Sequence, residues 1–268
     1  MALVREGQNA GHELHIVDDY RVMVEEVLPS LGWPNALGST VPSFGQVEAS
    51  IDAVAPLAGW LIERAEEGIE DRLVIAPALG GSKGVGFYGA VQRLCPRIYS
   101  GDFAAEELWS RVYSHANPDE RAVIHDNAGP EGLSGLWDVA VLLEDTVDPS
   151  TGEKAHSKGL VYTNKTVAEQ QEAFAVEAEA TRAKGIELVS ATVGHVIVDS
   201  AFLRESGEHQ RRGITRFIHY PPVDFANSKY FRGAAYTYWR LYFSGGETEV
   251  ATDDSGVRRA VRIPVLPR

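Results

Sequence analysis

Apolar residues recur at helical spacing in the stretch that follows Ser43. Intervals of three and four residues separate Val47, Ile51, Val54, Ala58, Leu61 and Ala65, and this pattern predicts an amphipathic helix to about Glu67. Ser43 and Gln46 form a capping-box pair, in which each side chain accepts from the other residue's backbone N–H. Pro56 lies inside the pattern and predicts a kink or a break, because proline removes a helical hydrogen bond.

A second helical region is predicted after residue 165. Thr166 and Glu169 form another capping box, and the helix should continue to Lys184. Gly185 suits the left-handed conformation that commonly ends a helix. One further helix is predicted over residues 191–205, and shorter ones over 22–31 and 103–114.

Apolar and alternating runs predict the strands. They cover residues 14–17, 73–79, 122–125, 139–143, 236–243 and 257–265. In the fifth run the larger apolar residues alternate with Tyr238, Arg240 and Tyr242, and Gly245–Gly246 is predicted to turn the chain after it. These elements together predict an α+β protein.

A polar stretch near residue 150 divides the chain into two predicted parts. The stretch Asp148–Gly159 is polar and rich in turn formers between two apolar segments, which is typical of a linker. We therefore expect a mixed α/β domain over residues 1–150. Helices plus an antiparallel sheet are expected over residues 151–268, and this second part is the candidate binding domain.

Composition restricts the classes of function. The chain has 268 residues, 44% hydrophobic and 24% charged, which is ordinary for a globular protein. It contains no apolar run of the ~20 residues that a membrane-spanning helix needs, and its N-terminus lacks a signal-peptide core. Cys95 is the single cysteine, so internal disulfides and multi-cysteine metal sites are excluded. The net charge of −13 opposes binding to polyphosphates. We expect a cytoplasmic or virion protein with neither nucleic acid nor a membrane as partner.

One resemblance starts at LVIAPALGGSKGVGF, where an apolar run meets Gly80, Gly84 and Gly86. The segment HDNAGP and the residues Tyr162 and Lys165 in YTNK follow in order. In the identity and order of these motifs, the chain resembles the short-chain dehydrogenases. The resemblance implies an oxidoreductase that binds NAD or NADP at the three glycines and uses the tyrosine and the lysine in catalysis.

The spacing of these motifs departs from that family. YTNK has two residues between its tyrosine and lysine where the family has three, and the predicted helix start at Thr166 places both before the helix. The interval from Gly86 to Asn127 is too short for the family's fold, because it has room for one strand–helix unit fewer than the family has there. Pro77 also interrupts a strand that would be central in a parallel sheet. The oxidoreductase is therefore kept as the alternative interpretation.

A second resemblance covers roughly residues 150–268. The segment AYTYWRLYFSGGETEVATDDSGVRRAVRIPV has a tryptophan-bearing strand, a glycine turn, a polar loop and a basic closing strand. It resembles C-type-lectin-like domains of formylglycine-generating-enzyme relatives and of phage or prophage tail proteins. The resemblance implies a non-catalytic binding or assembly protein without a cofactor. Its partner would be a protein or a small ligand, within a homo-oligomer or a larger assembly.

Aromatic residues of this segment are the candidate ligand-binding surface, because tyrosine and tryptophan give a large contact area at low entropic cost. The candidates are Tyr230, Tyr236, Tyr238, Trp239 and Arg240, with Tyr220 as a further aromatic residue. Core or sheet packing is the alternative role for about half of them.

Metal binding is a minor alternative. HELHIVDD contains His12, His15, Asp18 and Asp19 at a spacing that could present several ligands on one helix face. A polar, solvated N-terminal segment is the favoured interpretation, so no metal site is expected. Asp253–Asp254 is likewise better explained as an acidic turn than as a calcium site.

Overall fold

The computed structural model describes residues 16–31, 40–79, 133–205, 213–216, 230–237, 240–247 and 251–265. Within these ranges the chain forms helices and two mainly antiparallel sheets, which confirms the predicted α+β class. The first sheet has the order β1-β2-β8-β3, and each neighbouring pair is antiparallel. Its strands are β1 (Arg72–Leu79), β2 (Leu133–Leu142), β8 (Arg259–Ile263) and β3 (Leu188–Ser190).

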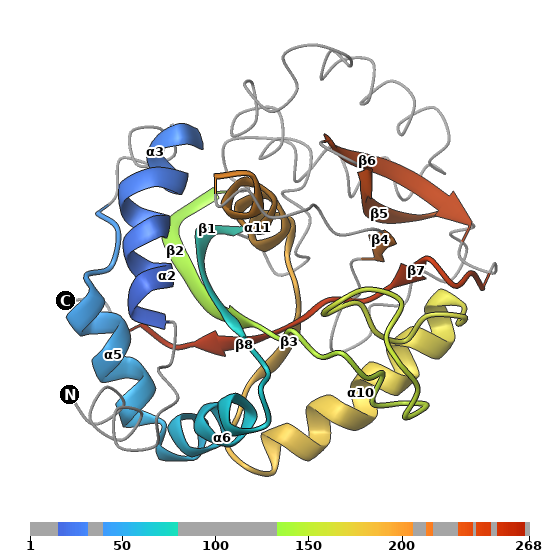
Figure 1. Ribbon diagram of the computed structural model, residues 1–268, viewed down its shortest axis with the longest axis horizontal. Coiled ribbons are helices and arrows are strands. Elements are labelled where there is room, and N and C mark those ends of the chain that lie inside the picture. The colour runs from blue at the N-terminus through green and yellow to red at the C-terminus, as the bar shows by residue number, and fades with distance from the viewer. Residues whose placement is uncertain are drawn as a thin grey trace.

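The second sheet has the order β6-β5-β4-β7. Its strands are β6 (Arg240–Glu247), β5 (Tyr230–Thr237), β4 (Gly213–Arg216) and β7 (Ser255–Gly256). The pairing of β4 with β7 is parallel, and the other two pairings are antiparallel. The short C-terminal segment that carries β7 and β8 contributes one strand to each sheet and so connects them (Figure 1).

The structure describes seven helical segments, and all but the first lie in stretches that were predicted to be helical. They are α2 (Ile16–Val22), η1 (Met23–Val27), α3 (Leu28–Leu31), α5 (Phe44–Ala53), α6 (Ala55–Glu66), α10 (Val167–Arg182) and α11 (Val193–Glu205). Both predicted capping boxes form, at Ser43 and at Thr166. The break predicted from Pro56 lies at Val54, between α5 and α6, and Gly185 has the positive φ of a helix terminator.

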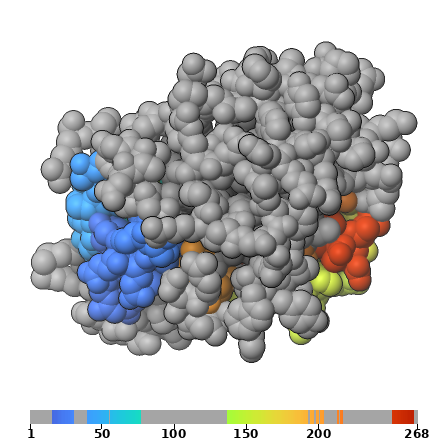
Figure 2. Space-filling view, turned by 90° about the horizontal axis from the view of Figure 1, so that it is seen from above, coloured from blue at the N-terminus to red at the C-terminus, as the bar shows by residue number. Residues whose placement is uncertain are grey.

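The N-terminal helices and the segment near residue 255 lie at opposite ends of the face in Figure 2.

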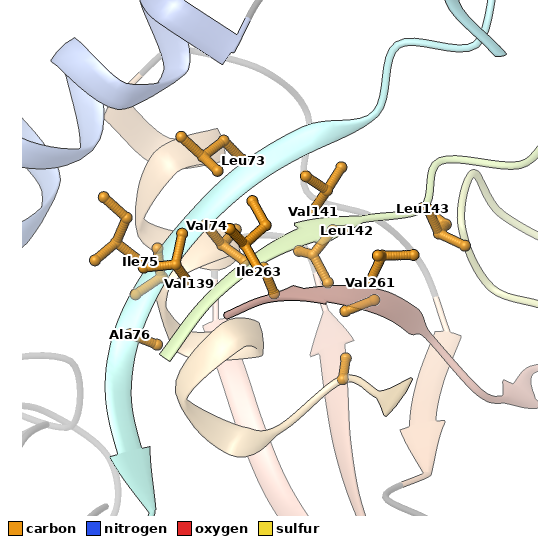
Figure 3. Packing of buried hydrophobic residues seen from close by; sticks show 14 of the residues in the cluster. Leu73, Val74, Ile75, Ala76, Val139, Val141, Leu142, Leu143, Val261 and Ile263 are labelled. Atoms are coloured by element: carbon orange, nitrogen blue, oxygen red, sulfur yellow. The ribbon is translucent and has the colours of Figure 1, made fainter. Parts of the chain in front are cut away.

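The core lies on both faces of the first sheet (Figure 3). Residues 73–76 of β1 are completely buried, and residues 139–142 of β2 are at most 1% exposed. A sheet covered on both faces needs apolar residues at successive positions, which explains why these strands are continuous apolar runs without polar alternation. In Figure 1, α11 lies over β1, whereas α6 and α10 lie on the other side of the sheet.

The strand β1 lies at the end of the first sheet, and α2 covers its open edge. The Leu73 N–H donates to the Asp19 carboxylate of α2 over 2.9 Å. Pro77 is tolerated because an end strand needs hydrogen bonds on one side only, and the register shifts between Pro77 and Leu79. The helix α2 thus satisfies a backbone donor that an uncovered edge would leave to other chains.

Strands on both sides of residue 150 share the first sheet, because β2 and β8 are hydrogen-bonded neighbours. The expected linker between them is also tied down. Arg258 donates to the Lys158 carbonyl over 3.3 Å, and the Asp148 side chain accepts from the Ser150 N–H over 2.8 Å. The division of the chain at residue 150 stays a prediction, and a separated C-terminal fragment would carry β8 without β1 and β2.

Two strand predictions are wrong. The run 236–243 is not one strand: β5 ends at Thr237, β6 begins at Arg240, and these two residues are opposite one another in an antiparallel pair. Gly245 and Gly246 do not turn the chain but lie inside β6, opposite Arg232 and Phe231. The alternation of apolar and polar residues continues through both strands, so it does not show where the chain reverses direction. Residues 16 and 17 begin α2 and do not end a strand, while the elements predicted at 103–114 and 122–125 lie outside the described residues.

Candidate functional site

Three pairs of neighbouring charged residues meet at one end of the first sheet. They are Asp71–Arg72 at the start of β1, Glu144–Asp145 just after β2, and Arg258–Arg259 at the start of β8. The ends coincide because β2 runs antiparallel to both of its neighbours. Successive residues of a strand point to opposite faces. Each pair therefore sends one charge to each face.

The α10-side cluster consists of Arg64, Asp71, Asp145, Glu177 and Arg259. Arg64 of α6 bonds both aspartates, with a 2.7 Å hydrogen bond to Asp71 and bonds of 3.0 and 3.1 Å to the two oxygens of Asp145. Arg259 of β8 donates to Asp145 and to Glu177 of α10. The cluster links two helices to all three strand ends.

Opposite charges determine the protonation states in this cluster. Burial opposes ionisation of Asp145, but Arg259 and Arg64 outweigh it and hold the pKa of the carboxyl below its ordinary value. Burial also opposes the charge of Arg259, yet Glu177 and Asp145 raise the pKa of the guanidinium. Both groups are therefore charged at neutral pH, and neither is suited to exchange a proton.

Tyr162 adds a hydroxyl to the α10-side cluster. The side chain is 1% exposed and donates to Glu177. Its backbone has φ 59°, which is uncommon for a residue with a β-carbon. Asp148 accepts from the Tyr162 N–H, and Gln170 donates to its carbonyl over 3.0 Å, so both sides of the peptide backbone hold this conformation. Burial and the neighbouring Glu177 raise the pKa of the phenol, despite Arg259.

The α11-side cluster consists of Arg72, Glu144, Asp199 and Arg258. Asp199 of α11 accepts from Arg72 over 2.7 Å and from Arg258 over 3.3 Å. Glu144 lies 3.9 Å from Arg258. The guanidinium of Arg72 also lies 4.4 Å from the centre of the Phe202 ring, a cation–π contact. Two arginines and two carboxylates thus balance in charge on the buried side of α11.

A histidine completes the polar groups under α11. His195 is one helical turn before Asp199 and is completely buried. Its Nε2 lies 3.1 Å from Asp138 Oδ2 of β2, and Arg262 of β8 lies 3.4 Å from the other oxygen of that carboxylate. Burial opposes the charge of Asp138, but His195 and Arg262 lower the pKa of the carboxyl below its ordinary value.

Chemically, these clusters are suited to hold strand ends and not to transform a substrate. Buried carboxylates with arginine partners are weak bases, and a buried phenol beside a carboxylate is a weak acid. Breaking a buried pair leaves an uncompensated charge, so the clusters specify which strands and helices come together. The pattern is typical of a structural network.

The sequence signal for this network was present as charged doublets at the ends of apolar runs. The residues DR, ED and RR each flank a buried strand. None of these doublets can be recognised as a site from the sequence alone, because a doublet at a strand end is ordinary until the strands are known to be neighbours. Only the pairing of β2 with β1 and β8 brings the three together.

The structure places both residues of the catalytic alternative in the segment before α10. Tyr162 is enclosed in the α10-side cluster, and Lys165 offers its carbonyl to Arg216 over 2.9 Å. Both precede the helix, because Thr166 is the N-cap residue of α10. The two residues therefore do not lie one turn apart on a helix, as that interpretation requires.

The three glycines of the cofactor alternative, Gly80, Gly84 and Gly86, lie outside the described residues. The strand that leads to them is described. It is β1, which lies at the end of its sheet and pairs antiparallel with β2. A dinucleotide-binding turn follows a strand of a parallel sheet, so this arrangement differs from what the dehydrogenase resemblance implies.

The candidate ligand-binding residues belong to the β5–β6 hairpin. Tyr230 and Tyr236 occupy positions of the same parity on β5, whereas Arg240 is opposite Thr237 and so has the other parity. The backbone register thus assigns the two tyrosines and the arginine to opposite faces of the sheet. Tyr220, Tyr238 and Trp239 lie outside the described residues.

Of the possible metal ligands at the N-terminus, His12 and His15 lie outside the described residues. Asp18 forms an exposed ion pair with Arg21 over 3.3 Å, and Asp19 accepts from the Leu73 N–H. Where the structure describes the chain, no group of three or more metal-ligating side chains comes together. Nor does any helix in those ranges have the length and apolar composition that a membrane crossing requires.

Comparison with known proteins identifies no relative. No family model matches the chain, and neither a curated protein nor a solved structure matches it.

Proposed function

We propose that this chain is a non-catalytic binding or assembly protein of phage or prophage type, which presents a ligand-binding surface on its C-terminal part. The observation that carries the proposal is the junction between the two sheets. One segment supplies β7 to the second sheet and, three residues later, begins β8 of the first. A binding surface is effective when a rigid scaffold holds it, and this connection supplies such a support.

Close packing at the junction supports the same conclusion. A β-carbon at Gly256 would lie 2.6 Å from the Val161 carbonyl oxygen, and one at Gly213 would lie 2.6 Å from the Leu160 side chain. The loop that contains Leu160 and Val161 is therefore in direct contact with β4 and β7. Only residues without a side chain allow this approach.

The pairing of the ionisable groups with one another also favours binding over catalysis. In the described ranges, the acidic and basic side chains of each cluster form ion pairs with one another on their own face of the first sheet. The candidate residues Tyr230 and Tyr236 lie instead on β5 of the second sheet. Tyrosine and tryptophan are the residues that most often dominate binding energy at interfaces.

A ligand screen with matched variants tests this proposal. The full chain is applied to arrayed glycans and peptides, beside a double variant with Tyr238→Ser and Trp239→Ser. The control is Val176→Ser on α10, because Val176 is 70% exposed and distant in sequence from the hairpin. We expect the double variant to lose about tenfold or more in affinity for any ligand that the wild type binds, and the control to keep it. Unchanged affinity in the double variant would contradict the proposed surface.

The nicotinamide alternative makes a separate prediction. A cofactor that binds the native state raises the melting temperature, by a few degrees at concentrations well above its Kd. Stabilisation of this size by NADH or NADPH, lost on Gly84→Val, would favour the oxidoreductase. No stabilisation by either dinucleotide would remove that alternative.

A further inference from the structure

The start of α11 is closed by an unusual pair of hydrogen bonds. The Thr192 hydroxyl accepts from the His195 N–H over 3.3 Å, and His195 Nδ1 accepts from the Thr192 N–H over 3.2 Å. This reciprocal arrangement is a capping box, in which the third helical residue is ordinarily glutamate or glutamine. Here a histidine takes that place.

The hydrogen bond from Thr192 determines where the imidazole carries its proton. A ring nitrogen that accepts a hydrogen bond has no hydrogen of its own, so the proton of the neutral ring is on Nε2. Nε2 lies 3.1 Å from Asp138, without the alignment of a hydrogen bond. The cap therefore requires neutral His195, whereas the neighbouring carboxylate attracts its cation.

We propose that His195 makes the first turn of α11 a pH-responsive cap, closed while the imidazole is neutral and released when Nδ1 takes up a proton. The added hydrogen points at the Thr192 N–H, and two donors cannot share a hydrogen bond. The imidazolium exchanges the cap for a stronger attraction to Asp138. Protonation thus replaces the contact of the imidazole with the helix start by a contact with Asp138 of the sheet. Only the hydrogen bond at the first turn of α11 is lost.

The charged groups around His195 limit how far the opening extends. They are Asp138 on β2, Arg262 on β8 with Glu187 beyond it, Asp199 on α11 itself and Arg72 on β1. On η1, which packs against α11, the acidic residues Glu25 and Glu26 are exposed. Asp199 stays bound to Arg72 and Arg258 over 2.7 and 3.3 Å. These two ion pairs hold α11 to the sheet one turn after His195. We expect only the first turn to open.

This inference does not depend on the proposed ligand surface. It concerns α11, a helix packed on the first sheet, and its readout is structural. The full chain is used without any ligand.

The test measures backbone hydrogen exchange at Thr192 in the ¹⁵N-labelled chain, corrected for the intrinsic exchange rate. Between about pH 8 and about pH 5, we expect protection of this amide to fall about fivefold, the loss of one helix cap. His195→Gln is the matched variant, because glutamine completes a capping box and does not titrate. Its Thr192 protection should stay constant across the same range.

Three outcomes would overturn the proposal. The first is constant Thr192 protection in the wild type while the imidazole titrates. The second is an equal fall in His195→Gln, which would assign the effect to another group. The third needs no variant: imidazole ¹⁵N shifts that place the proton of the neutral ring on Nδ1, or show no titration down to about pH 5.

Discussion

The two charged clusters at the end of the first sheet arise from the same three pairs of neighbouring residues, yet they differ in their contact with solvent. On the α11 side, the Asp199 and Glu144 side chains are completely buried. On the α10 side, the Asp145 and Glu177 side chains are 16% and 23% exposed. The α11-side cluster thus has no access to water at its carboxylates, whereas water reaches those of the α10-side cluster.

This difference predicts different energetics for similar contacts. A buried charge that loses its partner is left in a medium of low dielectric, where the cost is large. A partly exposed charge is screened by water and salt, and its pairs contribute less. We expect α11 to depend on its ion pairs more strongly than α10 does.

Asp199→Ala should have the largest effect. The change removes the carboxylate that accepts from Arg72 and Arg258 and leaves both buried guanidinium groups without this counter-charge. We expect the free energy of unfolding to fall by about 3–5 kcal/mol, measured by urea denaturation. A loss below that of the α10-side variant described next would reverse the proposed order of the two clusters.

Glu177→Gln is the matched change on the α10 side. Glutamine keeps the size of the side chain and a hydrogen-bonding group for Tyr162, but it loses the charge that faces Arg259. We expect a loss of about 1–2 kcal/mol at low salt that becomes smaller at about 1 M salt. Asp199→Ala should change little with salt, because its partners are buried. Equal salt dependence in both variants would remove the distinction between the clusters.

Much of the local structure could be predicted from the sequence, because its signals are local. The capping boxes at Ser43 and Thr166 gave two helix starts, and Gly185 gave a helix end. Buried strands were visible as apolar runs at 73–79 and 139–143. The hairpin of β5 and β6 could not be recognised, because strand alternation continues on both sides of the reversal.

The pairing of the strands, and with it the candidate site, could not be predicted. Val141 of β2 is opposite Val261 of β8, far away in the sequence, and no local pattern relates the two. The sequence assigns a catalytic role to Tyr162 only through the resemblance of YTNK to a family motif. Its partners Glu177 and Arg259 become visible only after α10 and β8 are in place.

Acid should reduce the stability that packing on each face of the first sheet provides, through one aspartate on each face. The pKa values of Asp145 and Asp138 lie below the ordinary aspartate value, chiefly because Arg259 and His195 respectively outweigh the cost of burial. A carboxyl with a lowered pKa in the folded state contributes stability above the ordinary value near about 4, and this contribution is lost as the pH falls through the folded-state pKa. We expect Asp145→Asn and Asp138→Asn each to make the acid-side slope of unfolding free energy shallower. A slope identical to that of the wild type would contradict the charged state assigned to that residue.

The smallest effect, and the sharpest contrast between the two sides, concerns the helix starts. Thr166→Ala removes the exposed cap of α10, and Thr192→Ala removes the half-buried cap of α11. Each should lower the Tm by about 3 °C at neutral pH, the usual consequence of a lost N-cap. At about pH 5 the Thr166→Ala effect should persist, because the backbone and side-chain hydrogen bonds from Thr166 keep the pKa of Glu169 below its ordinary value. The Thr192→Ala effect should shrink there, because the proposed protonation of His195 opens the first turn of α11, in which the Thr192 hydroxyl accepts its hydrogen bond. Thermal melts of both variants at the two pH values distinguish a helix start closed by a carboxylate from one closed by an imidazole, and equal behaviour would contradict the titrating cap.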